Sequence, residues 1–323
     1  MDIEFHYHIT FILARKAGFN ANNSYVIAYS SQYTDDNTFH YFINFKDGSP
    51  YFNETSQTFD ITKHSPKRQK IYPLFHFIPG GKECADLNQF KRSKYHPFTT
   101  IPDSPNARSL FDVALESKNL YRIGIATHAY ADSWTHQNFL GLKHKINGKR
   151  FDIIIPNIGH ADFLHDPDKV HNQWIDTRLK NEYADIDNDK RLLEAAKAIF
   201  TRFWKFNNPG KSDQQAGVEY DQLNLEAHLK DAMDETYFWG QNEKARIKAY
   251  KKICGELDMK KYKYDSKAWR HDAVEKRTFE IDLFDRYWAK KKFKGSHWHL
   301  FQEAVKAHRD LALNKFKPLF ETL

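Results

Sequence analysis

Apolar residues recur every three or four positions over most of this chain, which is the period of helices that bury one face. The segment 3–17, IEFHYHITFILARKA, has this pattern and ends at Gly18, a common residue after a helix C-terminus. A second helix is predicted over 22–33, because Asn22 and Ser24 supply N-cap oxygens. The N-terminal part of the chain is therefore expected to be helical.

The helical period fades between 37 and 105, where Pro, Gly, Ser and Thr cluster, so we expect a long irregular insertion there. Ser104-Pro105 then provides a cap and a first-turn proline for a helix over 104–118, and another helix is predicted over 119–141. A hairpin is predicted around Asn147-Gly148. The later predicted helices cover 169–182, 188–206, 215–236, 239–256, 268–292 and 297–317.

The composition of the 323 residues is that of a folded protein, with 41% hydrophobic residues and few Gly and Pro. No apolar run reaches the roughly 18 residues of a membrane-spanning helix, and no secretory signal pattern is seen, so we expect a cytoplasmic protein. Cys84 and Cys254 are the only cysteines, which excludes a cysteine-rich zinc module. Any metal would therefore be held by His, Asp and Glu.

The net charge of +7 is concentrated near the C-terminus, because residues 241–323 contain 21 Lys and Arg against 12 Asp and Glu. A basic region rich in aromatic residues suits contact with an anionic surface, either nucleic acid or a membrane. The alternative is a set of solvated helix faces without a partner. Histidine has the opposite distribution, since 12 of the 17 lie before residue 172.

The strongest candidate for chemistry is the spacing His128-x3-Asp132-x3-His136 in THAYADSWTHQ. On a helix, steps of four residues place all three side chains along one stripe. Two imidazoles around a carboxylate suit a polynuclear metal site in which the carboxylate bridges the ions. The alternative is a solvated polar stripe, with Tyr130 and Trp134 on the buried side.

Further histidines and carboxylates gather in short segments elsewhere. They are His6 and His8 in FHYH, Asp35 and Asp36 in YTDDN, His76 in FHFIPG, and His160, Asp162, His165 and Asp166 in IGHADFLHDPD. Divalent ions such as zinc take imidazole and carboxylate together, so their joint presence favours a metal site over isolated core histidines. On a helix His6 and His8 point about 200° apart, so only one can face a given site, and we favour His6.

Taken in order, these segments resemble the zinc-dependent phospholipase C superfamily, which also contains single-strand-specific nucleases. More narrowly, MDIEFHYHITF, AYSSQYTDDN, THAYADSWTHQNF and IGHADFLHDPD are similar to an uncharacterised bacterial family. The resemblance covers about residues 1–175. It implies a multi-helix core that holds up to three zinc ions and hydrolyses phosphoesters.

Position by position, the resemblance implies metal ligands on five segments. These are His6 or His8, Asp35 or Asp36, His76, the trio His128, Asp132 and His136, and His160 with Asp162 or His165. Asp36 and Asp132 are the expected catalytic carboxylates, with Asp36 orienting the attacking water. The mature enzymes begin with a Trp whose amine and carbonyl bind metal. In this chain the Met1 amine, Asp2 or one of the two N-terminal histidines replaces that pair of ligands, or the pair is absent. The resemblance therefore allows one, two or three ions.

We therefore predict an all-α protein with a metal-binding core, 1–182, and a helical C-terminal region, 183–323, packed on it as one unit. Its predicted function is zinc-dependent hydrolysis of a phospholipid, a nucleic acid or a small phosphodiester. One alternative is a metal-dependent phosphohydrolase with a His-Asp doublet at His165-Asp166, although Pro167 disfavours the helix such a doublet needs. Another is a non-enzymatic helical module that binds partners and holds structural metal or none.

Overall fold

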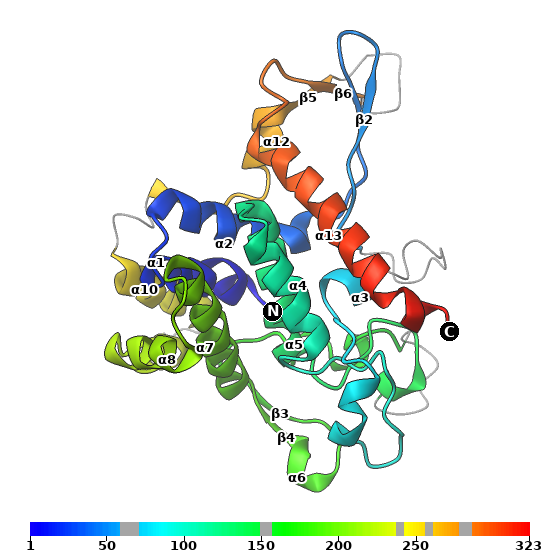
Figure 1. Ribbon diagram of the computed structural model, residues 1–323, viewed down its shortest axis with the longest axis vertical. Helices are drawn as coiled ribbons and strands as arrows, with labels where there is room; N and C mark the ends of the chain where they lie inside the picture. The colour runs from blue at the N-terminus through cyan, green and yellow to red at the C-terminus, as the bar shows by residue number, and fades with distance from the viewer. Residues whose placement is uncertain (59–70, 149–156, 237–241, 256–260, 278–285) are drawn as a thin grey trace.

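The computed structural model describes residues 1–58, 71–148, 157–236, 242–255, 261–277 and 286–323, and helices dominate it (Figure 1). The helical elements are the π-helix η1 Glu4–Ile9, α1 Thr10–Lys16, α2 Ala21–Asp36, α3 Ile71–Phe75, η3 Lys82–Leu87, α4 Pro105–Glu116, α5 Leu120–Thr135, η4 Lys145–Asn147, η5 Ala161–Phe163, α6 Asn181–Ala184, α7 Asn188–Asn207, α8 Asp213–Gln222, α9 Leu225–Met233, α10 Asn242–Cys254, α12 Ala268–Ala273 and α13 His297–Phe320. The strands are β1 Phe42–Asn44, β2 Pro50–Phe52, β3 Gln173–Ile175, β4 Asp185–Asp187, β5 Val274–Arg277 and β6 Arg286–Ala289. In the part of the chain described, no helix combines the length and apolar character needed to cross a bilayer.

Capping side chains explain where the helices around the candidate site begin. Asn20 accepts a hydrogen bond from the backbone N–H of Asn23 at the start of α2. Ser104 caps α4 ahead of a first-turn proline, and Asn119 caps α5 by accepting from two backbone N–H groups. The helices predicted over 22–33, 104–118 and 119–141 are thus present, with ends displaced by a few residues.

Helix predictions are less successful in the second half of the chain. The helices predicted over 188–206 and 297–317 are present as α7 and α13, and 239–256 corresponds to α10, with its first three positions and its last outside the described residues. The segment 215–236 divides into α8 and α9, because Asn224 adopts a left-handed backbone with φ of 49°.

Two helix predictions are wrong, and the second strand of the predicted hairpin lies outside the described residues. Segment 169–182 forms β3 and reaches only the start of the short α6. Among its described residues, 268–292 is helical only in α12 and also contains β5 and β6. Around Asn147-Gly148 the chain forms the 3-10 helix η4, and the following positions 149–156 lie outside the described residues.

The fold is mostly helical, but the all-α prediction is corrected by two small sheets. One has the strand order β2-β1-β6-β5, and the other pairs β3 with β4. Strand β1 of the insertion runs parallel to β6, with Ile43 opposite Tyr287 and Asn44 opposite Trp288. Strands of three or four residues are too short to show an alternating pattern, and β1 also depends on β6, a partner more than 200 residues away in sequence.

The central helix α5 packs against α2, α4, α7 and α13, and one hydrophobic core joins residues on both sides of the 182/183 division. Gly124 permits the closest of these approaches. A Cβ at this position would lie 2.4 Å from the carbonyl oxygen of Ile27 and 2.5 Å from Cβ of Ser30. Helices α2 and α5 therefore approach closely enough for carboxylates and imidazoles from both to meet.

Candidate metal centre

The α5 stripe forms the floor of the candidate metal centre. His128 and Asp132 lie one turn apart on α5, and His136 is the residue that ends it. All three side chains are buried, with exposed fractions of 0%, 1% and 4%. Such burial contradicts a solvated polar stripe, because charged groups are rarely buried without partners.

The π-helix η1 gives His6 and His8 different surroundings. His6 lies against His128, with ring centroids 3.8 Å apart, and its Nε2 is 3.2 Å from Oδ1 of Asp132. His8 points elsewhere and stacks beside Tyr250 at 6.4 Å. The structure therefore brings His6, but not His8, to the site.

Asp132 faces nitrogen atoms with both of its carboxylate oxygens. Its Oδ1 lies 2.9 Å from the α-amino nitrogen of Met1, and also faces His6. Its Oδ2 lies 3.2 Å from Nδ1 of His76 and 3.2 Å from Nε2 of His128. One carboxylate thus contacts two sets of nitrogen atoms, of which only His128 belongs to the α5 spacing.

Asp35, at the end of α2, completes this part of the cluster. One of its oxygens lies 3.7 Å from both His76 and His128, and the other lies 3.9 Å from His6. The neighbouring Asp36 is directed away from the cluster and accepts a hydrogen bond from the hydroxyl of Tyr264. Of the two predicted alternatives, Asp35 is positioned to contribute to a metal site, whereas Asp36, the predicted catalytic carboxylate, is not.

A second group lies beside the first and includes an acid that sequence reasoning missed. Nε2 of His136 is 3.1 Å from Oδ1 of Asp168, and Nε2 of His160 is 3.2 Å from its Oδ2. The Met1 nitrogen lies 3.2 Å from Asp168 and so stands between the two groups. The 3-10 turn η5 and the left-handed Leu164, with φ of 53°, carry the chain from His160 to Asp168.

Asp162 and His165, predicted beside His160, belong to none of the His/Asp groups found in the described residues. His165 is exposed at the wall of the cavity described below. The His165-Asp166 doublet is not part of such a group either, which disfavours the phosphohydrolase alternative built on it. The signal for Asp168 was present in HDPDK, but a helical spacing of three or four residues cannot select an acid eight positions after His160.

The electrostatics keep the carboxylates ionised. Burial would raise the pKa of Asp132, but His136 and the Met1 amine hold it well below its usual range. Asp168 behaves in the same way, mainly because of His160 and the amine. Burial lowers the pKa of the Met1 amine, but the two carboxylates outweigh it and raise that pKa to about 12. Burial, with His128 and the amine nearby, lowers the pKa of His6 to about 3.

A cavity of about 380 Å³ opens onto both groups. Its walls combine the acids and imidazoles of the cluster with the apolar or aromatic side chains of Tyr72, Phe77, Ile158 and Leu164. Phe77 stacks on His136 at 4.3 Å and fixes the orientation of that ring. A small molecule could therefore reach the cluster.

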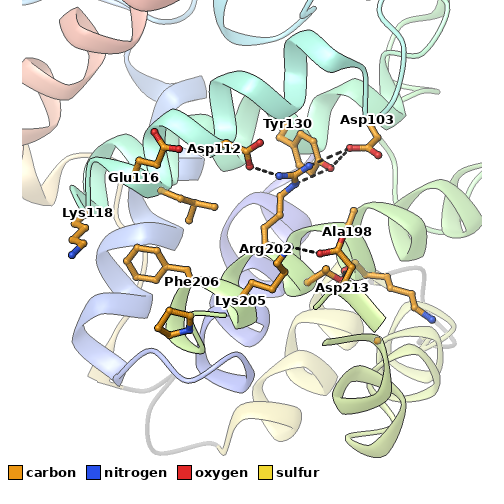
Figure 2. Close-up of a pocket in the computed structure, with 15 residues that line it drawn as sticks. Asp103, Asp112, Glu116, Lys118, Tyr130, Ala198, Arg202, Lys205, Phe206 and Asp213 are labelled. Atoms are coloured by element: carbon orange, nitrogen blue, oxygen red, sulfur yellow. Dashed lines mark hydrogen bonds and ion pairs between the residues drawn. The ribbon is translucent and has the colours of Figure 1, made fainter. Parts of the chain in front are cut away.

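A larger groove of about 880 Å³ lies elsewhere, between α4, α5, α7 and α8 (Figure 2). At its centre Arg202 reaches Tyr130 and the carboxylates of Asp103 and Asp112. The charged groups of this groove mostly pair with one another. A further His/Asp group, His171 with Asp189 and Asp234, lies apart from these two and is largely exposed, and Lys230 shares Asp234.

Comparison with known proteins places the whole arrangement in one family. A family model matches residues 1–316, which include every residue of both groups and most of the C-terminal region. The chain belongs to DUF6765, a family of unknown function. No curated protein and no solved structure matches it. Membership of DUF6765 names no activity, so function has to be argued from the geometry.

Proposed function

We propose that the chain is a metal-dependent, and specifically zinc-dependent, phosphoester hydrolase with a phospholipase C-like core. The observation that carries the proposal is the position of Asp132. Its two oxygens contact separate sets of nitrogen atoms, and the second group, around Asp168, lies beside them. A bridging carboxylate between neighbouring ions is a feature of polynuclear hydrolytic sites. The order of these residues along the chain also follows the superfamily resemblance.

The residues present fit zinc. Three buried imidazole nitrogens, Nδ1 and Nε2 of His6 and Nδ1 of His128, form no well-aligned hydrogen bond with a described residue, although Nε2 of His6 lies 3.2 Å from Asp132. Zinc bonds of about 2.0–2.1 Å imply tetrahedral ligand atoms roughly 3.3 Å apart. The distances from Asp132 to His76 and His128 are 3.2 Å, and the two imidazole nitrogens are 3.0 Å apart.

Three sets of residues would hold the ions. They are His6 and Asp132 with the Met1 amine, which would release its proton on binding; Asp35, His76, His128 and Asp132; and His136, His160 and Asp168. Bound zinc would lower the pKa of a water molecule towards neutrality and neutralise charge on a phosphoryl oxygen.

Asp35 is the best candidate for the carboxylate that orients the attacking water and accepts its proton. Both Asp35 and Asp132 line the cavity, but the Asp35 side chain is 26% exposed and that of Asp132 only 1%. Gln57 donates a hydrogen bond of 3.4 Å to Oδ1 of Asp35 and restrains its orientation. Tyr72 and Leu164 limit access of bulk water from the side of the cavity.

The cavity favours a substrate with a single phosphoester group. No Lys or Arg is among its described lining residues, so the side chains offer no cation to neighbouring phosphates of a polymer. Its volume of about 380 Å³ lies at the small end of the range typical of ligand sites. A phospholipid headgroup or a small phosphodiester fits this description better than a long nucleic acid.

The test is metal content by mass spectrometry together with hydrolysis of phosphodiesters, phospholipids and oligonucleotides, using wild type, Asp132→Asn and Asp168→Asn. We expect two or three zinc ions per chain in the wild type, fewer in both variants, and turnover reduced at least about 100-fold in Asp132→Asn. The matched control is His171→Gln, which removes an imidazole from the exposed group and should change neither quantity.

Two results would overturn the proposal. A wild-type protein that remains metal-free after incubation with zinc excludes the metal centre. A fully metal-loaded protein that hydrolyses none of these substrates keeps the metal centre but removes the enzymatic function, leaving a structural role for the ions.

A further inference from the structure

A small sheet projects from the helical body (Figure 1). Large aromatic side chains are exposed on it and in the segment just before β1. Phe39, Phe42 and Phe52 are 61%, 51% and 58% exposed. Phe42 and Phe52 are opposite one another in the β1–β2 ladder, so both lie on the same face. Trp288 of β6 is opposite Asn44 and extends this face, partly buried, across the sheet.

The other face of the same sheet is covered. Ile43 is fully buried, and Tyr51 packs against Phe293 at 5.1 Å and Trp298 at 6.2 Å near the start of α13. The inner face of the sheet is therefore covered, and the exposed Phe42 and Phe52 lie on its outer face. Exposed aromatic clusters of this kind commonly mark interaction sites.

Lysines gather at one end of the sheet. A contact of 5.1 Å between the rings of Phe45 and Phe293 holds the β1–β2 turn against the segment that follows β6. This contact brings together exposed lysines from the two segments, namely Lys46, Lys291, Lys292 and Lys294. None of the four makes an ion pair with a described residue, and Asp47 is the acid in this turn.

We propose that an aromatic–lysine surface, made of Phe42, Phe52 and the four lysines at the turn end of the same sheet, docks the protein on an anionic lipid bilayer. Aromatic rings enter the bilayer interface, while the neighbouring lysines contact acidic headgroups. The charge of the lysines selects an anionic partner. The rings of Phe42 and Phe52 meet edge to face, with planes at 76°, so they do not form a flat platform for stacked bases.

Docking does not depend on the metal centre, so it can be tested with metal removed. The full-length chain is sedimented with phosphatidylcholine vesicles, with and without phosphatidylglycerol, in the presence of a chelator. We expect binding only to the anionic vesicles, with an affinity that falls steeply as salt is raised. Vesicle binding in the presence of the chelator would show that docking does not require the metal centre. The proposed hydrolase could then fail without affecting this inference.

Two double variants probe the two components. Replacing Lys291 and Lys292 by Gln should lower the partition coefficient about 30-fold, since each lysine contributes about fivefold. Phe42→Ser with Phe52→Ser should lower it at least about tenfold. The matched controls are Lys91→Gln with Lys94→Gln, and Val218→Ser, whose side chain is 51% exposed on α8. These controls should bind as the wild type does.

Three results would overturn the proposal. One is equal binding to neutral and anionic vesicles, and another is equal loss in the control variants. In the third, the protein does not bind vesicles but binds single-stranded oligonucleotides or forms a dimer. That binding or dimerisation is then lost in the variant Phe42→Ser with Phe52→Ser. Melting temperatures near the wild-type value exclude unfolding as the cause of any loss.

Discussion

At the scale of single residues, backbone direction decides which of two neighbouring groups can act. His6 enters the cluster and His8 packs beside Tyr250, although only one residue separates them. Asp35 faces three imidazoles, whereas Asp36 accepts a hydrogen bond from Tyr264. Residue type alone gives each pair the same chemistry, and only the position on the helix separates their roles.

The two adjacent carboxylates provide a test at this scale. Asp35→Asn removes an oxygen anion from the cluster, so zinc content should fall by about one ion per chain and affinity roughly 10–100-fold. Asp36→Asn keeps an oxygen that accepts from Tyr264 and should retain the wild-type metal content. Metal titration followed by elemental analysis measures both. Equal metal loss in the two variants would contradict the assignment of Asp35.

At the scale of elements, helices could be predicted where the apolar period is long, as in α2, α4 and α5, and for α4 the capping residue Ser104 was predicted as well. For α2 the cap is Asn20 and not the predicted Asn22 or Ser24. The stripe of His128, Asp132 and His136 on α5 could be predicted from its spacing because that segment has a regular helical period. The strands could not, because β1 gains its stability from β6, far away in sequence. Asp168 was missed because a loop, rather than a helical repeat, brings it to His160.

The close contact of α2 with α5 makes a second prediction. In Gly124→Ala the added methyl group would meet backbone of α2 at 2.4 Å, so the helices must separate. Overpacking of this kind costs about 1–3 kcal/mol of folding free energy. Because α2 carries Asp35 and α5 carries Asp132, metal affinity should fall as well.

The matched control for Gly124 is Gly217 in α8, where a Cβ would meet nothing within 4 Å. Gly217→Ala should raise the free energy of unfolding by roughly 0.5–1 kcal/mol through helix propensity. Chemical denaturation measures both variants. A Gly124→Ala protein as stable as the wild type would show that α2 and α5 are not in tight contact.

At the scale of the whole molecule, the C-terminal region supports the N-terminal part of the site. Arg246 of α10 makes a bidentate ion pair with the buried Glu4 of η1, at 2.8 and 2.7 Å. The hydroxyl of Tyr7 donates to the carbonyl oxygen of Tyr262 at 2.6 Å. The residues beyond 182 therefore hold the π-helix that places His6, and the two regions are expected to unfold together.

Helix α13 connects the C-terminal region to the segment that carries His76. Buried His308 donates from Nε2 to the carbonyl oxygen of Leu74 at 3.0 Å, and burial lowers its pKa from 6.5 to about 4. The unfolded chain therefore binds more protons than the folded one between these values. The contribution of neutral His308 to stability is present above pH 6.5 and is lost as the pH falls towards 4.

His308→Gln tests this link, because a Gln amide can donate to Leu74 without titrating. Between pH 7 and pH 5 the unfolding free energy of the wild type should fall by about 2 kcal/mol more than that of the variant. Taking the difference between the two proteins cancels the other histidines, including those of the metal centre. If both lose stability equally, His308 does not couple α13 to the segment before His76 through a neutral, buried imidazole.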